Sequence, residues 1–248
     1  MIIIKTQKEI ELMQEGGKVL AQVLKKVIQA VKPGVTTIEL DKLARKLIKD
    51  AGGEPSFLNY NNFPCALCTS IDDAVVHGIP KKDEIVKNGN IIGLDLGLKY
   101  KNYYTDMAVT LAVGRVSKIG RKLIKTASRA LDIGMEQVKP GNHVGDIGAA
   151  IQQYTESQGF SVVRDLVGHG VGKDVHEQPR VANFGITGTG EKIEAGMTLA
   201  LEPMICEKGY QVKTTPDKWT VVTVDGGLAA HFEHTVVVTE SGCEILTC

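Results

Sequence analysis

The sequence has no long apolar run, and its charges cancel. Lysine and arginine together number 29, as do aspartate and glutamate, so the formal net charge is zero. A chain without net charge offers no broad field to attract nucleic acid or an anionic membrane. No apolar stretch approaches the roughly 20 residues that cross a bilayer, and residues 1–8 lack the features of a signal peptide. These absences predict a cytoplasmic protein with no nucleic acid substrate and no membrane partner.

Cysteine is also scarce. The five cysteines are scattered and odd in number, and Cys65 and Cys68 form a lone C-x-x-C with no second pair. A zinc knuckle or redox pair at these two residues stays open as a minor alternative. The pattern favours small buried residues and reduced thiols in a reducing compartment.

A four-residue segment occurs twice. Val-Lys-Pro-Gly at 31–34 recurs at 138–141, each time between two segments with helical apolar spacing. Pro-Gly between two such patterns is typical of a turn, because proline fixes φ and glycine accepts the strained position. We expect the helices that follow to span 37–50 and 144–157, and the matched flanks favour an internal duplication.

After each helix pair the pattern changes to that of strands, rich in Val, Thr and Ile. The expected strands are 90–98 and 103–113 in the first half, and 161–166, 198–205, 220–224 and 232–239 in the second. No low-complexity linker divides the chain. The sequence therefore predicts a single α+β domain over 1–248, with similar halves of about 1–115 and 116–248 and helices outside a shared sheet.

Acidic residues interrupt two of the apolar strands. Asp95 lies within Ile-Ile-Gly-Leu-Asp-Leu-Gly-Leu, and Asp106 lies within Tyr-Tyr-Thr-Asp-Met-Ala-Val-Thr. If these strands form a hairpin that turns at Tyr100-Lys101, the two aspartates lie directly opposite one another. Like charges across an antiparallel pair are destabilising unless a cation lies between them.

Two glutamates repeat this anomaly. Glu202 ends the run Met-Thr-Leu-Ala-Leu, and Glu233 directly precedes His-Thr-Val-Val-Val. Taken singly, each acid is more simply a solvent-facing residue or part of a separate salt bridge. Burying several unpaired carboxylates together is too costly, so the set of four predicts a site for hard cations.

Histidines in a glycine-rich loop strengthen this prediction. His169 and His176 lie within Gly-His-Gly-Val-Gly-Lys-Asp-Val-His, and the phosphate-loop pattern G-x-x-x-x-G-K-[ST] is absent. Four carboxylates balance the charge of two divalent ions, and a neutral imidazole leaves this balance unchanged. The set is typical of a two-metal hydrolase.

The order of these motifs resembles type I methionine aminopeptidase over about residues 7–247. The resemblance rests on His-Gly-Ile-Pro at 77–80, Gly-His-Gly at 168–170, Leu-Glu-Pro-Met at 201–204, Glu-His-Thr at 233–235 and the ending at 242–247. The helical insertion of type II enzymes has no room here. The resemblance implies the duplicated pita-bread fold, an α+β fold with helices packed outside a curved antiparallel sheet.

The resemblance implies two divalent metal ions, with cobalt, manganese, iron and zinc all compatible with the ligands. The implied ligands are Asp95, Asp106, His169, Glu202 and Glu233. Asp106 and Glu233 would bridge the ions, Asp95 would chelate one, and His169 with Glu202 would complete the other.

The implied activity is hydrolytic removal of the initiator methionine from the N-terminus of nascent proteins and peptides, with a small second residue preferred. Glu202 would shuttle a proton, His176 would hydrogen-bond the carbonyl oxygen, and His77 would contact the scissile amide. The expected partner is the nascent polypeptide N-terminus, ribosome association is left open, and a monomer is expected. His143, His231 and His234 receive no role.

The methionine pocket implied by the resemblance has aromatic and sulfur-containing walls. The matching residues are Phe57, Tyr60, Phe63, Cys68, Val175 and Trp219. Three residues depart from the family pattern: Phe57 replaces a cysteine, Val175 a phenylalanine, and Gly97 a hydroxyl residue. These departures are expected to alter the pocket shape and the surroundings of the ligands rather than the ligands themselves.

Two other functions remain as alternatives. A proline-specific dipeptidase or creatinase-like enzyme would carry a large extra N-terminal domain, whereas this sequence begins directly at the catalytic half. A metal-free binding protein of the same fold would have lost ligands, and here all five are present.

Overall fold

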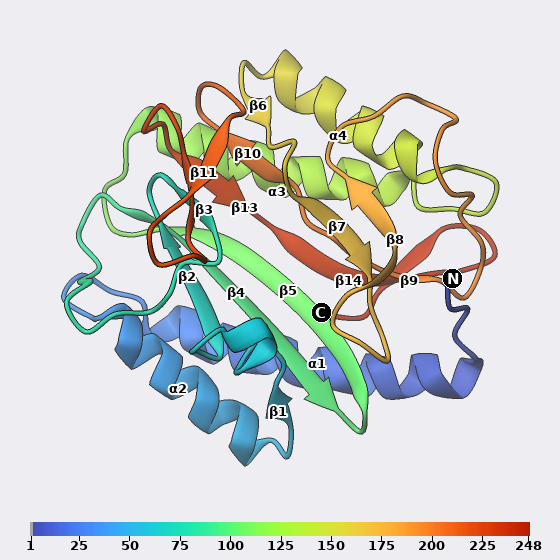
Figure 1. Ribbon diagram of the computed structural model, residues 1–248, viewed down its shortest axis with the longest axis horizontal. Coiled ribbons are helices and arrows are strands. Elements are labelled where there is room, and N and C mark those ends of the chain that lie inside the picture. The colour runs from blue at the N-terminus through green and yellow to red at the C-terminus, as the bar shows by residue number, and fades with distance from the viewer. Residues whose placement is uncertain (1) are drawn as a thin grey trace.

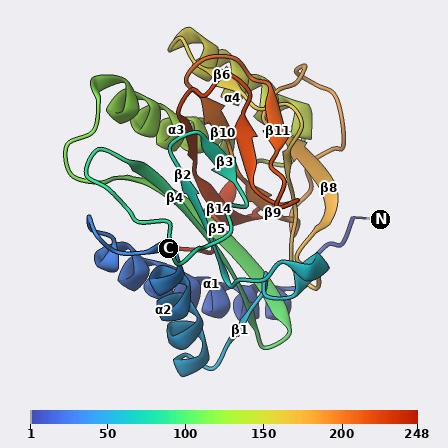
Figure 2. The same ribbon diagram turned by 60° about the vertical axis from the view of Figure 1, so that its left-hand side comes forward.

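The computed structural model describes residues 2–248, and in it two pairs of helices lie outside a broad antiparallel sheet (Figures 1 and 2). The helices are α1 (Gln7–Ala30), α2 (Thr37–Asp50), α3 (Lys118–Glu136) and α4 (Val144–Ser157). Helix α1 packs against β4 and β5, α3 packs against α4, and α4 packs against β8. No helix within the described residues is long and apolar enough to cross a membrane.

Local capping contacts set the helix starts. Thr36 N donates to the Glu39 carboxylate at 2.8 Å, and His143 N donates to the Asp146 carboxylate at 2.7 Å. Each contact satisfies a backbone donor just before the first turn of α2 or α4. The helices expected at 37–50 and 144–157 have these bounds in the structure.

The largest sheet in residues 2–248 has the strand order β1-β4-β5-β14-β9-β7-β8, with β2 also on β4 and β15 also on β14. Its strands are β1 (Glu54–Pro55), β2 (Leu67–Ile71), β4 (Ile91–Tyr100), β5 (Tyr103–Ala112), β7 (Val167–Gly170), β8 (Glu177–Ala182), β9 (Thr198–Leu201), β14 (Glu233–Val238) and β15 (Cys243–Ile245). The strands outside it are β3 (Ala74–Val76), β6 (Ser161–Val162), β10 (Met204–Cys206), β11 (Val212–Thr214), β12 (Val221–Thr223) and β13 (Ala229–His231). A short 3₁₀ turn, η1 (Tyr60–Asn62), precedes β2.

The side chains of strand β4 that face helices α1 and α2 are apolar. Leu94, Leu96 and Leu98 are fully buried in the core that these helices form with the sheet. Because side chains alternate along a strand, Asp95 and Gly97 face the other way. A nearly continuous apolar run therefore presents its one charged residue to the opposite face.

The register of the β4–β5 hairpin differs from the expectation. Asp95 pairs with Ala108 and Gly97 pairs with Asp106, so the aspartates are diagonal neighbours and the prediction of directly opposed residues was wrong. The turn lies at Lys101-Asn102, where φ is +49° and +69°. A two-residue hairpin turn with both φ values positive matches strand twist, and asparagine tolerates that conformation. The shift keeps both aspartates on one face.

The predicted strands of the second half are shorter in the structure. The strand expected at 198–205 is interrupted after β9, and β10 begins at Met204, because Glu202-Pro203 breaks the ladder. The strand expected at 161–166 contains only the two residues of β6. Strands β7 and β8, which flank the glycine-rich loop, were not expected.

Candidate active site

Sheet register brings three of the predicted ligands into one row across the strands. Asp95 on β4 pairs with Ala108 on β5, which in turn pairs with Glu233 on β14. Glu202 directly follows the last residue of β9 and so comes beside Glu233 in the same row. Residues that pair across a sheet share a face. Three acids remote in sequence therefore point to the same side.

The neighbouring row contains the other two ligands. Gly97 pairs with Asp106. Thr235, two residues after Glu233, is next in this row, and its hydroxyl forms hydrogen bonds with the Asp106 backbone. Thr235 pairs with Ala200, which pairs with His169 on β7. The two rows lie two residues apart along each strand and hold all five predicted ligands. Small residues between the ligands leave the space above the sheet open.

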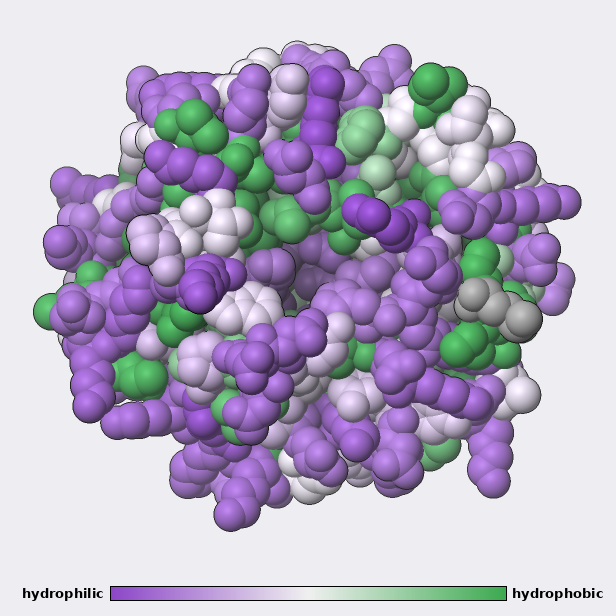
Figure 3. Space-filling view, in the orientation of Figure 1, coloured by the Kyte–Doolittle hydropathy of each residue, from purple (hydrophilic) through white to green (hydrophobic). Residues whose placement is uncertain are grey.

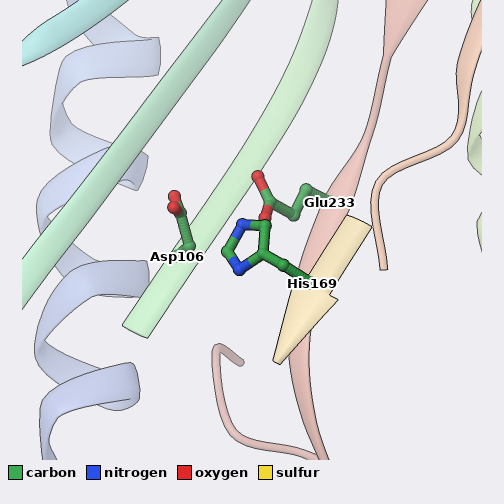
Figure 4. A group of neighbouring side chains, drawn as sticks. All are labelled: Asp106, His169 and Glu233. Carbon is green, nitrogen blue, oxygen red and sulfur yellow. The ribbon is translucent and has the colours of Figure 1, made fainter. Parts of the chain in front are cut away.

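Three of these side chains converge at close range. One ligand atom each from Asp106, His169 and Glu233 lies within 4.8 Å of the others (Figure 4). His169 Nε2 also lies 3.5 Å from Glu202 Oε1. Such spacing is suited to coordination of a common ion.

The carboxylates are buried without compensation from the protein. Within residues 2–248, Asp95 Oδ1, Asp106 Oδ1 and Glu233 Oε1 are buried and have no hydrogen-bond partner. Burial raises the pKa of these carboxyls and of Glu202, and neighbouring carboxylates raise the pKa of Asp95, Glu202 and Glu233 further. Oxygen atoms without partners and close like charges fit bound divalent cations, which would satisfy both.

Backbone contacts hold two of the ligands in place. His169 Nδ1 lies 2.9 Å from the Gly170 carbonyl, an acceptor, so Nδ1 carries the proton and Nε2 presents its lone pair to the site. The Thr235 hydroxyl accepts from Asp106 N and donates to Asp106 O, both at 2.9 Å. One side chain thereby fixes the backbone of the central aspartate.

The loop after β7 carries His176 to the mouth of the site. The rings of His176 and His169 are 4.4 Å apart, edge to face. Glu177 accepts hydrogen bonds from Lys173 N and Asp174 N, and its other oxygen forms a buried ion pair with Lys5. The N-terminal segment is thereby connected to the loop that carries His176.

His77 reaches the cavity through a strained backbone. Its φ is +58°, unusual for a residue with a side chain. Gly78 follows, and a Cβ there would lie 1.9 Å from the Thr69 carbonyl, so glycine allows this close approach to β2. The His77 ring lies 6.2 Å from that of Trp219, and burial lowers its pKa to about 4, which keeps the imidazole neutral at pH 7.

The ligands line a cavity of about 190 Å³, and the same face of the molecule is hollowed near its centre (Figure 3). Five predicted pocket residues also line it: Phe57, Tyr60, Phe63, Cys68 and Trp219. The sixth, Val175, is buried in the protein and is not part of the cavity lining. Asn61 lines the cavity and was not predicted.

The departures at positions 57 and 97 are structurally connected. A Cβ on Gly97 would lie 2.0 Å from Ser56 Oγ and 2.9 Å from the Phe57 ring. Ser56 N donates to Gly97 O, which holds this segment against β4. The missing side chain at position 97 therefore makes room for Ser56 and for the aromatic wall that Phe57 adds to the cavity.

His231 also reaches the site, although no role was expected for it from the sequence. This residue is 3% exposed, and its Nε2 lies 3.7 Å from Glu202 and 3.9 Å from Glu233. Thr110 fixes its backbone through two hydrogen bonds of 2.8 and 2.9 Å. Its position two residues before Glu233, on the same face, was the available signal.

This arrangement of buried carboxylates and imidazoles defines a candidate metallohydrolase site, and comparison with known proteins agrees. Residues 11–240 match the model of metallopeptidase family M24. The chain belongs to metallopeptidase family M24.

Within that family, the similarity is to methionine aminopeptidases. The chain is 48% identical to the methionine aminopeptidase of Clostridium acetobutylicum, over 100% of this chain and 99% of that protein. The crystal structure of methionine aminopeptidase from Thermotoga maritima superposes with a TM-score of 0.98 at 43% identity, covering 100% and 99% of the two chains. Prolidase from Pyrococcus furiosus shares the fold alone, at 23% identity and a TM-score of 0.82, over 99% of this chain and 65% of prolidase. These comparisons confirm the predicted pita-bread fold.

Proposed function

We propose that this protein removes the N-terminal methionine from nascent proteins and peptides by metal-dependent hydrolysis and prefers a small second residue. The observation that carries the proposal is the pair of ligand rows, in which Asp95 Oδ1, Asp106 Oδ1 and Glu233 Oε1 are buried without a hydrogen-bond partner within residues 2–248. The similarity to methionine aminopeptidases along the whole chain supports the choice of substrate.

The proposed ligands of two divalent ions are Asp95, Asp106, His169, Glu202 and Glu233. When bound, these ions would supply Lewis acidity and lower the pKa of a water molecule. Asp106 and Glu233 lie at the centre of the two rows, which suits them to the bridging positions. Asp95 lies at the β4 end, while His169 and Glu202 lie at the β7–β9 end.

Three residues are proposed to act on the substrate. Glu202, whose pKa is raised by burial and by Asp95 and Asp106, holds and returns the proton of the attacking water. His176 donates a hydrogen bond to the peptide carbonyl oxygen as negative charge develops on it. His77, neutral and fixed beside Trp219, contacts the scissile amide from the other side of the cavity.

The proposed binding pocket for methionine is the aromatic part of the same cavity. Phe63 and Trp219 meet edge to face at 5.1 Å, and Asp217 holds Trp219 by accepting its backbone N–H at 3.0 Å. A flexible thioether side chain packs favourably among aromatic rings and the Cys68 thiol. Phe57 makes the pocket narrower than the cysteine of the family pattern would.

The proposal extends to the surroundings of the enzyme. All five cysteines are free, which fits a reducing compartment such as the cytoplasm. Action on nascent chains would bring the enzyme to the ribosome, and we propose a monomer whose ribosome association is transient. Size-exclusion chromatography and co-sedimentation with ribosomes test these two points.

We also propose that residues 1–248 are a single domain whose halves arose by duplication. Gly34 and Gly141 both have a φ of +96° after the repeated Val-Lys-Pro. The residues that precede α2 and α4 form matching isolated bridges, Thr36 with Ile85 and His143 with Lys192. Cooperative unfolding in one transition would support the single domain, and two separate transitions would contradict it.

The decisive experiment follows methionine release by metal-stripped protein before and after each divalent metal is restored. Met-Gly-Met is expected to be cleaved and Met-Lys peptides are not, because the second side chain must fit between His77 and the pocket wall. A Leu-Pro dipeptide serves as the control for dipeptidase activity. Cleavage of Leu-Pro, or equal release of methionine before glycine and lysine, would overturn the proposal.

A further inference from the structure

Two residues of the cavity are joined by a hydrogen bond whose direction matters. Tyr60 Oη lies 2.7 Å from His176 Nδ1, and the two rings are 5.2 Å apart and tilted by 52°. Tyr60 belongs to η1 and His176 to the loop before β8, segments 116 residues apart in sequence. The contact therefore bridges two loops on the rim of one cavity.

The partner of each Nδ1 atom determines which imidazole nitrogen carries the proton. For His169 the partner is the Gly170 carbonyl, which can only accept, so Nε2 is left as a lone pair suited to a metal. For His176 the partner is a phenol, which can donate. An imidazole nitrogen accepts a hydrogen bond more strongly than a phenol oxygen. The neutral pair is therefore most stable with the phenol as donor and the proton of His176 on Nε2.

Both groups of the pair keep their neutral forms. Burial raises the pKa of the Tyr60 phenol, and the packed surroundings lower the pKa of the His176 imidazole. Neither shift changes which atom faces the phenol, because that is fixed by the 2.7 Å contact.

The segment that carries Tyr60 is held in place by its own backbone. Asn59, Asn61 and Asn62 have φ values of +67°, +46° and +69°, a conformation that asparagine tolerates better than most residues. Tyr60 N donates to Phe57 O at 2.9 Å, and Phe63 N donates to Tyr60 O at 2.8 Å. These bonds within the turn fix the direction of the Tyr60 side chain.

We infer that Tyr60 is a positioning residue that fixes His176 as the Nε2–H tautomer and connects occupancy of the methionine pocket to the hydrogen-bond donor of the reaction. The inference rests on the proposed function. The Tyr60 ring lines the pocket while its hydroxyl holds His176. When the first side chain of the substrate fits poorly against the Tyr60 ring, it displaces the Tyr60 hydroxyl. The hydrogen-bond donor of His176 is then misplaced as well. The selectivity of the enzyme among substrates with different N-terminal residues therefore appears partly in kcat and not only in KM.

The kinetic test uses Tyr60→Phe, which keeps the ring and removes the hydroxyl. With Met-Gly-Met, kcat is expected to fall about tenfold with KM little changed, as for loss of one hydrogen bond. In Tyr60→Phe, the ratio of kcat for substrates with methionine at the first position to kcat for those with leucine is expected to decrease. Tyr103→Phe is the matched control, because Tyr103 does not line the cavity and its hydroxyl donates to Glu9.

The Tyr60→Phe change is then combined with His176→Ala. Because Tyr60 acts through His176, the second substitution is expected to add no further loss of kcat in the His176→Ala background. Fully additive losses, or a fall in kcat that Tyr103→Phe reproduces, would overturn the inference.

A spectroscopic test does not depend on turnover. In ¹⁵N-histidine-labelled protein loaded with diamagnetic Zn²⁺, the His176 signals, assigned by their loss in His176→Ala, are expected to report Nε2–H in the wild type. Tyr60→Phe is expected to give a mixture of tautomers. An Nδ1–H tautomer in the wild type would overturn the inference even if Tyr60→Phe failed to fold. Absence of methionine release together with the expected Nε2–H signal would contradict the proposed function instead.

Discussion

The two sides of the candidate metal site are built in different ways. On one side, a single hairpin of two ten-residue strands presents Asp95 and Asp106, joined by a two-residue turn. On the other, His169, Glu202 and Glu233 come from three short segments that meet only in the folded sheet. The hairpin is local in sequence, whereas the second group depends on contacts distant in sequence.

This difference has consequences for stability and for prediction. A regular hairpin that is buried against α1 and α2 keeps its shape when one side chain changes. The second group depends on side-chain contacts such as that of Thr235 with Asp106 and on a glycine-rich loop held by Glu177. We expect substitution of the two acidic side chains on the hairpin to change chemistry with little effect on the fold, and changes on the other side to affect both.

The largest expected effect is that of Asp106→Asn. Losing the charge at the centre of the two rows is expected to abolish peptidase activity and to remove at least one metal equivalent, while the circular dichroism spectrum is unchanged. Asp50→Asn, at the exposed end of α2, is the matched control. Normal turnover with two tightly bound metals would show that the central position of Asp106 does not make it a bridging ligand.

The two histidines of the glycine-rich loop are expected to separate metal binding from catalysis. His176→Ala is expected to lower kcat by about 10²–10³ with metal content unchanged, as for loss of one oxyanion donor. His169→Ala is expected to weaken metal binding itself, measured by metal analysis after dialysis. Equal loss of metal in both variants would require the two roles to be reassigned.

Metal removal is expected to reverse the usual pH dependence of stability at this site. Burial raises the pKa of the four carboxyls and lowers the pKa of His77, His169 and His231, so the metal-free folded state binds more protons than the unfolded state above pH about 6.5, where histidine is neutral in both states. The melting temperature of the stripped protein is therefore expected to fall as pH rises above about 6.5. Added divalent metal should remove this fall, because it binds the ionised carboxylates. A stripped protein whose melting temperature rises over that interval would contradict the burial of these acids without compensation.

The smallest expected effect concerns the packing of the hairpin itself. Gly97→Ala places a methyl group against Ser56 and Phe57 and is expected to cost about 1–3 kcal/mol of the free energy of unfolding. Gly93→Ala on the same strand is the matched control. The added Cβ there would lie 3.5 Å from Ser70 Cβ, which is an ordinary van der Waals contact. Ser56→Ala should relieve part of the Gly97→Ala cost, measured by denaturant unfolding of the double variant. Equal costs at positions 93 and 97 would contradict the connection between Gly97 and the pocket wall.

Sequence reasoning was most successful where the signals were local. Helices α2 and α4 have the predicted bounds because an apolar period of three to four residues ends in both cases near a glycine, Gly52 or Gly159. The two strands of the hairpin were predicted to within two residues at each end. Their register was not, because Lys101-Asn102 carries no Asn-Gly signal and the left-handed turn is visible only in the structure.

Sequence reasoning failed where distant segments meet. Strands β7 and β8 are rich in glycine and polar residues, so their pairing depends on β9 rather than on propensity. His231 is an unremarkable residue in sequence, and its closeness to Glu202 follows from the pairing of β13 with β10, which no local pattern indicates. The grouping of the acids was predictable from their improbable burial, whereas their geometry was not.

The buried ion pair of Lys5 and Glu177 makes the first residues of the described chain a reporter of the active site. Lys5 N also donates to Gly196 O at 2.8 Å, so the segment is anchored at both its backbone and its side chain. Thermodynamic linkage is reciprocal, so any ligand that stabilises the loop before His176 must also stabilise the contacts of Lys5 with Glu177 and Gly196. We therefore expect amide hydrogen exchange at Lys5 to slow when the cavity is occupied, although Lys5 is not among the residues that line it.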